Sequence, residues 1–332
     1  MAELTPQAKR ALLNKKNVVG VGLGCKRIRG QKTDDRAIVV FVKKKERKNN
    51  LQARDLVPQE LEGTPTDVIE VGEITLLASR TARHRPAFPG ISIGHHRVSA
   101  GTFGAVVKDK RSGIPLILSN NHVLANMEGD NRGRARIGDP IVQPGTYDGG
   151  RVPNDVIGYL HRFVELRTER RPSTCGVAGM MERVGNFVLR TMFPQYEMRF
   201  LRKSNVTNLV DAAVAKPVGP ELITANILDL GVPQGVAEGV VGQKIYKSGR
   251  SSGLTQGEIL AVHVDINVNM GEIGTAQFSD QIMATAMSQP GDSGSLVLDE
   301  QKRAIGLLFA GSSQATVINR IENVLRLLDI TF

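Results

Sequence analysis

The sequence predicts a mainly β protein built from many short strands, preceded by a small α/β module and closed by a carboxy-terminal helix. The chain has 35 glycines and no tryptophan, and from Gly90 onward short apolar runs alternate with glycine, proline and polar turns. Short strands at this spacing are typical of β-sandwiches and β-barrels. The length of 332 residues accommodates two or three domains.

The first module is expected to cover residues 1–78. Val18–Cys25, Ala37–Lys43 and Asp67–Ile74 have the composition of strands, and the polar stretch before Pro58 allows a helix. The alternate glycines of the first strand do not match the G-x-G-x-x-G dinucleotide fingerprint. We therefore interpret them as part of a glycine-rich strand.

Residues 79–89 are basic and contain two prolines, so they are predicted to be a linker. Two later segments, Gly176–Met192 and Asn319–Ile330, repeat apolar residues at helical spacing. An apolar stripe on a helix normally faces a hydrophobic core. We expect both helices to be core-facing, and neither to be a membrane or cofactor device.

The net charge of +10 comes from 43 basic and 33 acidic residues. The basic residues are spread, with local concentrations at Lys43–Lys48, Arg80–Arg85 and Arg167–Arg171. No recognisable nucleic-acid module accompanies them, so we interpret them as solvated loops and do not favour a nucleic-acid partner. Acidic substrates or partners stay a lesser alternative.

The longest apolar runs are far too short to span a membrane, and the amino terminus lacks the apolar core of a secretory signal. The only two cysteines, Cys25 and Cys175, lie in segments that look unrelated. A low cysteine content fits a reducing compartment. The sequence therefore predicts a cytoplasmic protein with no membrane partner.

The strongest chemical signal is Ser293, which lies in Gln289-Pro-Gly-Asp-Ser-Gly-Ser directly before the apolar strand Leu296–Leu298. A nucleophilic serine needs a tight turn that projects its hydroxyl, and flanking glycines permit that backbone path. The N–H groups of Gly291 and Ser293 would then stabilise the oxyanion of a tetrahedral intermediate. An ordinary polar turn has the same composition, so the motif needs partners elsewhere.

His122 follows an apolar strand, in Pro115-Leu-Ile-Leu-Ser-Asn-Asn-His. Imidazole is the general base that suits serine, because its pKa allows proton transfer near neutrality. The other histidines lie in the linker, as an adjacent pair or in polar-alternating segments: His84, His95, His96, His161 and His263. A lone histidine is more often structural, and the serine motif is what favours a catalytic role for His122.

Asp211 opens the apolar strand in Asn208-Leu-Val-Asp-Ala-Ala-Val-Ala. A solvated charge is poorly placed there, whereas a carboxylate that accepts a hydrogen bond from an imidazole is well placed. Asp155 stays open as the rival, although its strand would directly follow the glycine-rich turn at 145–150.

The order His…Asp…Ser, carried by Leu-Ser-Asn-Asn-His-Val, Val-Asp-Ala-Ala-Val-Ala and Gly-Asp-Ser-Gly-Ser, resembles that of the trypsin/chymotrypsin-like serine proteases. The resemblance covers residues 90–332. It implies two antiparallel six-stranded β-barrels, at 90–225 with a helical insertion at about 166–204, and at 226–332 with the final helix. His122 and Asp211 would come from the first barrel and Ser293 from the second.

Two further segments carry related resemblances. Lys247-Ser-Gly-Arg-Ser-Ser-Gly-Leu-Thr-Gln-Gly resembles G-R-T-T-G-x-T-x-G of intracellular bacterial trypsin-like peptidases. Val-Val-Gly-Val-Gly and Thr-Asp-Val-Ile-Glu-Val-Gly in the first module are similar to the extension of bacterial relatives and of plant narrow-leaf-type proteases. These resemblances imply a bacterial, intracellular peptidase.

The resemblance also implies a specificity pocket. Met287 stands six residues before the serine, where trypsin-like members place the residue at the pocket base, and Ser288 follows it. The segment Phe309, Ala310 and Gly311 would form the wall. An uncharged, small or medium apolar side chain is therefore expected at the cleavage position. No terminus that zymogen cleavage would free is evident near Gly90, so Asp292 is interpreted as a brace of the turn.

Together these observations predict a serine endopeptidase that cleaves proteins or peptides through an acyl-enzyme and needs no metal or organic cofactor. Homo-oligomerisation stays open. One rival is a protease-fold protein that binds peptides without catalysis, or is activated by a partner. A basic nucleic-acid-binding protein with incidental motifs is the other rival.

Overall fold

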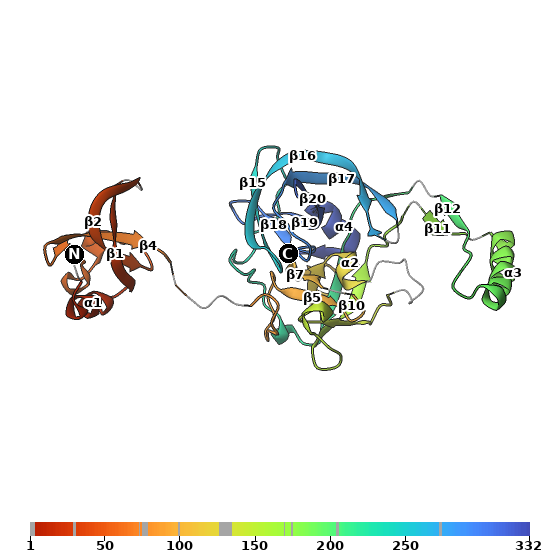
Figure 1. Ribbon diagram of the computed structural model, residues 1–332, viewed down its shortest axis with the longest axis horizontal. Coiled ribbons are helices and arrows are strands. Elements are labelled where there is room, and N and C mark those ends of the chain that lie inside the picture. Colours follow the sequence, from red (N-terminus) through yellow and green to blue (C-terminus); the bar gives the residue numbers. More distant parts are fainter. Residues whose placement is uncertain are drawn as a thin grey trace. The chain divides into compact units, whose positions relative to one another are not determined.

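The computed structural model describes residues 4–28, 31–72, 74, 79–98, 100–125, 135–168, 170–173, 175–203, 206–271 and 274–332. The chain divides into two compact units, Met1–Ala78 and Ser79–Phe332. Figure 1 draws the first unit in red to orange and the second from orange through green to blue. The described residues contain no helix that is both long and apolar enough to cross a bilayer.

The described part of the first unit is a four-stranded sheet with one α-helix. The strand order is β1–β2–β4–β3, in which β1 and β2 are antiparallel and β2 and β4 are parallel. Its elements are α1 (Pro6–Leu13), β1 (Val18–Ile28), β2 (Gln31–Val42), η1 (Lys48–Asn50), η2 (Ala53–Asp55), β3 (Glu60–Leu61) and β4 (Thr64–Glu70). Leu12 of α1 packs with Ile38 and Val40 of the sheet, which gives this unit its own core. Two short 3₁₀ turns stand where the sequence allowed a helix before Pro58.

The second unit contains two β-barrel sheets, as the sequence predicts. The first sheet has the order β21–β7–β8–β14–β10–β9–β5–β6. Its strands are β5 (Ser92–His95), β6 (Gly101–Thr102), β7 (Ala105–Asp109), β8 (Pro115–Ser119), β9 (Pro140–Val142), β10 (Val156–Phe163), β14 (Ala213–Pro217) and β21 (Ile330–Thr331). The two-residue strands β6 and β21 pair at the two edges of this sheet, outside its six other strands.

The second sheet has the order β13–β17–β16–β15–β18–β19–β20. Its strands are β13 (Thr207–Asn208), β15 (Lys244–Gly249), β16 (Gly253–Asn269), β17 (Thr275–Thr285), β18 (Leu296–Leu298), β19 (Ala304–Gly311) and β20 (Ala315–Arg320). An additional antiparallel pairing of β17 with β20 closes six of these strands into a ring. Closure removes the open edges that a flat sheet would expose.

The closing helix α4 (Ile321–Leu328) is buried on one face, as predicted. Its Ile321, Val324 and Leu328 join a hydrophobic cluster that contains Leu118 of β8 and Leu307 of β19. The cluster therefore ties the two barrels to the same helix. Figure 1 shows α4, in dark blue, behind the labels of β19 and β20.

Residues 79–89, predicted to be a linker, belong to the second unit and are held to it by hydrogen bonds. The Arg80 guanidinium donates to the carbonyl of Gly90 and the hydroxyl of Ser248, at 2.9 and 2.8 Å. The Arg85 guanidinium donates to the Asp155 carbonyl oxygen at 3.1 Å. Basic residues in this stretch thus satisfy buried and partly buried acceptors elsewhere in the second unit.

Helix α3 (Gly176–Met192) corrects a sequence-based expectation. The expected core-facing side is exposed, and none of the residues of α3 is buried. Its exposed apolar residues are Val177, Met180, Met181, Val184, Phe187, Val188 and Met192, which we call the apolar face of α3. Two short antiparallel strands, β11 (Arg170–Pro172) and β12 (Leu201–Lys203), connect the helix to the barrels (Figure 1). We call residues 170–203 the arm.

Candidate active site

Ser293 lies in a turn whose backbone requires glycine, and we call residues 289–295 the serine turn. Gly291 and Gly294 have φ angles of +97° and +92°, a region that other residues rarely adopt. A Cβ on Gly294 would also lie 2.1 Å from the hydroxyl of Ser119, so no other residue fits there. These two glycines set the path that carries Ser293 between them.

A buried ion pair fixes the serine turn to strand β15. Asp292 and Lys247 both have fully buried side chains, and the Lys247 ammonium lies 2.9 Å from the Asp292 carboxylate. The same carboxylate accepts hydrogen bonds from the backbone N–H groups of Ser251, Ser252 and Gln289, at 2.8, 3.0 and 2.9 Å. Burial raises the pKa of Asp292, but hydrogen bonds from the Ser252 hydroxyl and the amides, together with the charge of Lys247, lower it by more. The pKa is therefore below its usual value, and the carboxylate stays ionised. The brace that the sequence suggested for Asp292 therefore pairs with an internal lysine.

The first barrel also holds the serine turn, through Thr102 of β6. The Thr102 N–H donates to the Ser293 carbonyl at 2.8 Å, and its hydroxyl donates to the Gly291 carbonyl at 2.9 Å. The hydroxyl in turn accepts from the N–H of Arg250 at 3.0 Å. One buried threonine thus fixes the turn of the second barrel against a strand of the first.

His122 lies in the one-turn helix α2 (Asn121–Leu124), directly after β8, and Asp211 lies two residues before β14. Strands β8 and β14 are neighbours in the sheet, which brings the two side chains together. The His122 Nδ1 atom lies 2.5 Å from the fully buried Asp211 Oδ2, and the His122 N–H donates to Oδ1 at 3.2 Å. Asp211 thereby sets both the position and the tautomer of the imidazole.

Asn319 of β20 supports this pair from the second barrel. Its Oδ1 accepts from the Asp211 N–H at 3.0 Å, and its Nδ2 donates to the carbonyls of Asp211 and Leu307 at 3.2 and 3.0 Å. Asn120 Nδ2 also donates to the Asp211 carbonyl, at 2.7 Å. The backbone around Asp211 is therefore fixed by two buried amide side chains.

The pKa of His122 is raised above the ordinary histidine value. Burial lowers it, but the charge of Asp211 and its hydrogen bond to the ring raise it by more. The His122 side chain keeps 22% of its surface exposed, so one edge of the ring is accessible. The arrangement stabilises an imidazolium, which is the form a general base takes after it accepts a proton.

Gly101 lies where the His122 helix and the serine turn approach each other. A Cβ on Gly101 would lie 2.4 Å from Val123 and 3.0 Å from the Ser293 carbonyl oxygen, so both neighbours are in close contact with it. The Ser293 hydroxyl donates to the Phe309 carbonyl at 3.4 Å. Among the hydrogen bonds of the described residues, none joins His122 to Ser293. Such bonds are often long in unliganded sites and tighten when substrate binds.

The N–H groups of Gly291 and Ser293 were predicted to form an oxyanion hole. Within the described part of the chain, neither of them donates to a protein acceptor, whereas the neighbouring N–H groups of Asp292 and Gly294 donate to Gln289 and Leu308. Two unengaged donors on a rigid turn, separated by one residue, are suited to bind a developing negative charge.

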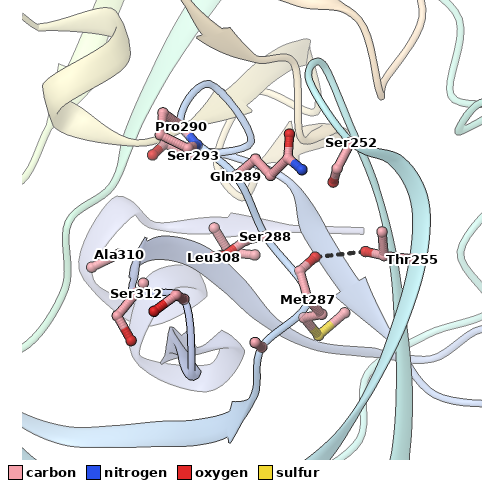
Figure 2. Close-up of a pocket in the computed structure, with 13 residues that line it drawn as sticks. Ser252, Thr255, Met287, Ser288, Gln289, Pro290, Ser293, Leu308, Ala310 and Ser312 are labelled. Atoms are coloured by element: carbon pink, nitrogen blue, oxygen red, sulfur yellow. Dashed lines mark hydrogen bonds between the residues drawn. The ribbon is translucent and has the colours of Figure 1, made fainter.

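A cavity of about 790 Å³ opens beside Ser293 (Figure 2). The predicted pocket residues Met287, Ser288, Ala310 and Gly311 all line it. Phe309 does not: its side chain is buried against Phe278, with ring centroids 4.7 Å apart. The other lining residues are Ser252, Thr255, Ala286, Gln289, Pro290, Leu308, Ser312 and Ser313. None of the lining residues carries a charge.

The rival carboxylate Asp155 lies elsewhere. It forms an ion pair with Arg83 at 3.1 Å and accepts from the N–H of Arg151 at 2.9 Å. The buried histidine His95 pairs with Asp139 at 3.1 Å, so it has its own structural partner. Of the His122–Asp211 and His95–Asp139 pairs, the first belongs to the segment that approaches the serine turn at Gly101.

Sequence reasoning missed three residues that hold the site: Thr102, Lys247 and Asn319. Each is polar and fully buried, with its partners in another element. Lys247 lies in the glycine- and serine-rich segment that resembles peptidase sequences, and this resemblance could have indicated a role for Lys247 at the site. Thr102 and Asn319 lie in short strands with no motif, so only the fold brings them to the site.

Comparisons with known proteins give one family and several solved structures. A family model described as the Nal1 C-terminal domain matches residues 198–324. Protein NARROW LEAF 1 of Oryza sativa subsp. japonica is 24% identical over 341 residues, which cover 93% of this chain and 54% of that protein. The chain therefore spans about half the length of this curated relative.

The similar solved structures are serine proteases. Nocardiopsis protease is 15% identical with a TM-score of 0.46, and the match covers 74% of this chain and 98% of that chain. Cellulomonas bogoriensis chymotrypsin is 16% identical with a TM-score of 0.44, covering 74% and 97%. A glutamic-acid-specific serine protease is 18% identical with a TM-score of 0.45, covering 74% and 99%.

Proposed function

We propose that this protein is a serine endopeptidase, with Ser293 as nucleophile, His122 as general base and Asp211 as the residue that orients His122. The observation that carries the proposal is the buried Asp211 carboxylate, which holds the His122 ring 2.5 Å from its own oxygen beside the serine turn. A buried carboxylate bonded to Nδ1 leaves Nε2 as the proton acceptor.

The proposed reaction is acyl transfer. His122 Nε2 takes the proton of the Ser293 hydroxyl as Oγ bonds to the peptide carbonyl carbon, and the carbonyl electron pair becomes an oxyanion held by the Gly291 and Ser293 N–H groups. The tetrahedral intermediate collapses, and His122 returns the proton to the leaving amine. Water then attacks the acyl-enzyme by the same route and releases the acid.

We further propose an uncharged side chain at the cleavage position. The cavity beside Ser293 is lined by apolar and neutral polar residues, including Met287, Leu308 and Ala310, and offers no counter-ion for a charged group. Burying an unpaired charge there would be costly. A peptide-library digest is expected to show small or medium apolar residues, and strict cleavage after Arg or Lys would reject this specificity.

The test of the reaction is active-site labelling. A fluorophosphonate probe is expected to modify the wild-type chain on Ser293 and to leave Ser293→Ala unmodified. In related triad enzymes loss of the serine lowers turnover by roughly 10⁶-fold, and a similar loss is expected with a protein substrate. Ser79→Ala, at an exposed serine outside the serine turn, is the control and should be labelled like the wild type. Labelling of Ser293→Ala at the wild-type level would refute the assignment.

One observation favours a second candidate, a chain that binds peptides and reacts only after a partner rearranges the site. The Ser293 hydroxyl donates to the Phe309 carbonyl, a backbone acceptor of β19. For the partner-activated form, the purified chain would bind peptide yet fail to react with the probe. Labelling that appears only after a cell extract is added would select this candidate.

A further inference from the structure

The arm carries a large apolar surface that none of the described residues of the chain buries. Phe187 and Val184 on the apolar face of α3 are 74% and 58% exposed. Beyond the helix, the side chains of Phe193 and Tyr196 are also exposed, and their rings lie 6.5 Å apart. Contiguous exposed apolar surface of this kind marks a site of contact with another molecule.

The chain that returns from α3 covers a different side of the helix. Asn186 exchanges two hydrogen bonds with the backbone of Met198, at 2.9 and 2.7 Å, and Glu182 accepts from the N–H of Phe200 at 2.5 Å. Met198 also lies against Gly185, where a Cβ would meet its methyl at 2.6 Å. The returning segment therefore fixes the helix in the arm and leaves the apolar face open.

The arm also carries a net positive charge. Residues 170–203 contain seven basic and two acidic residues, so about a tenth of the chain carries half of its net charge of +10. Arg183 and Arg190 follow the apolar residues Met180 and Phe187 by three positions, which places them at the border of the apolar face. A helix with an apolar face and basic borders has the character of an interfacial helix.

The charge distinguishes between the candidate occupants of this face. Two arms of the same chain would bring two strongly basic segments together, and like charges oppose that contact. A nucleic acid would neutralise the arginines but would leave the apolar residues in water. A partner surface that is anionic on its outside and apolar beneath would pair with the arginines and also cover the apolar residues.

We propose that the arm binds the surface of an anionic phospholipid bilayer, with α3 lying in the interface and its apolar face among the acyl chains. The arginines at its border would contact lipid phosphates, and Phe193 and Tyr196 would lie at the headgroup level. The sequence had suggested no membrane partner because no segment can span a bilayer. Lying on the surface needs only one apolar face, and α3 supplies it.

Vesicle cosedimentation tests the proposal on the full chain, in a Ser293→Ala background that prevents self-digestion. The chain is expected to sediment with vesicles that contain phosphatidylglycerol, and not with pure phosphatidylcholine. Added salt should weaken the binding, because part of the attraction is electrostatic. Equal binding to both vesicles, or no binding to either, would overturn the proposal.

Variants of the arm identify the surface that binds. Phe187→Asp is expected to lower vesicle affinity by roughly tenfold or more, since a carboxylate cannot enter the acyl region. Phe187→Leu should keep it. Val240→Asp, an exposed apolar position outside the arm with the same change in charge, is the matched control. Loss of binding in Val240→Asp but not in Phe187→Asp would contradict the assignment.

The arginines are tested in the same assay. Arg183→Gln with Arg190→Gln is expected to weaken binding by about fivefold for each charge removed, whereas the exposed pair Lys9→Gln and Arg10→Gln should leave it unchanged. Light scattering and DNA binding complete the test. Two results, each in the absence of vesicle binding, would assign the face to another partner and overturn the proposal. One is an oligomer that Phe187→Asp dissociates, and the other is duplex DNA bound through the arm.

Discussion

The serine turn and the arm depart in opposite ways from the usual rule that charged side chains are exposed and apolar side chains are buried. Around the serine turn, charged and polar side chains are buried: Lys247, Asp292 and Asp211 are all fully enclosed. On the arm, large apolar side chains such as Phe187 are exposed instead. Both arrangements cost free energy in an isolated chain, because buried charge loses hydration and exposed apolar surface orders water.

The difference shows what each region is suited to do. Every buried charge at the serine turn has a partner within hydrogen-bond distance, so the polar groups fix one geometry before any substrate arrives. No element of the described chain covers the exposed apolar residues of α3. The free-energy cost of their exposure to water is therefore removed only when another molecule covers them. Chemistry needs the first arrangement and docking needs the second.

Among the residues that support Ser293, the largest effect is expected at the buried Asp211. Asp211→Asn is expected to lower turnover by roughly 10⁴-fold, because the amide favours the wrong imidazole tautomer and cannot stabilise the imidazolium. Steady-state kinetics with a peptide substrate measures the loss. Asp155→Asn, the rival carboxylate, should retain wild-type turnover; the reverse ranking of the two variants would move the catalytic aspartate to Asp155.

The next effect is on stability. Lys247→Met leaves the Asp292 charge buried without its ion-pair partner, which is expected to cost about 3–5 kcal/mol of unfolding free energy. Denaturant unfolding followed by circular dichroism measures it. The double variant Lys247→Met with Asp292→Asn should recover part of the loss, because no uncompensated charge is left. A single variant as stable as wild type would mean that the pair does not hold the serine turn.

The pH dependence of activity tests the His122–Asp211 pair. The raised pKa means that folding favours protonated His122, so this stabilisation is present at low pH and is lost as the pH rises through the folded pKa. Catalysis needs the neutral ring, and kcat/KM should therefore fall about tenfold per pH unit below that pKa. The acid limb is expected above the ordinary histidine value of 6.5. A limb below this value would indicate that Asp211 does not act on the ring.

The sequence predicted the parts of the fold and site that depend on local pattern. The strand-rich second unit, the closing helix and the candidate residues His122, Asp211 and Ser293, each next to an apolar strand, could all be predicted from residues within ten positions of each other. Residues such as Thr102 and Asn319 could not, because their partners are far along the chain and no short motif contains both. Buried polar residues in short strands are the signal to look for.

Helices α3 and α4 show the limit of periodicity. Both repeat apolar residues at helical spacing, and the sequence predicted a core-facing side for each. Only α4 has a sheet to pack on, because β20 leads directly into it, whereas β11 and β12 connect α3 to the barrels. The pattern identifies the apolar face of a helix, but the surrounding fold determines what covers that face.

The smallest expected effect is Val184→Ala on the apolar face of α3, and the same substitution in α4 is its control. Val324 is fully buried, so Val324→Ala should lower the unfolding free energy by about 2 kcal/mol. Val184 is 58% exposed, so Val184→Ala should change it by no more than about 0.5 kcal/mol. Both substitutions raise helix propensity alike, which isolates burial as the cause. Equal losses in denaturant unfolding would mean that α3 is covered in the free chain, and the arm would then have no face to offer a membrane.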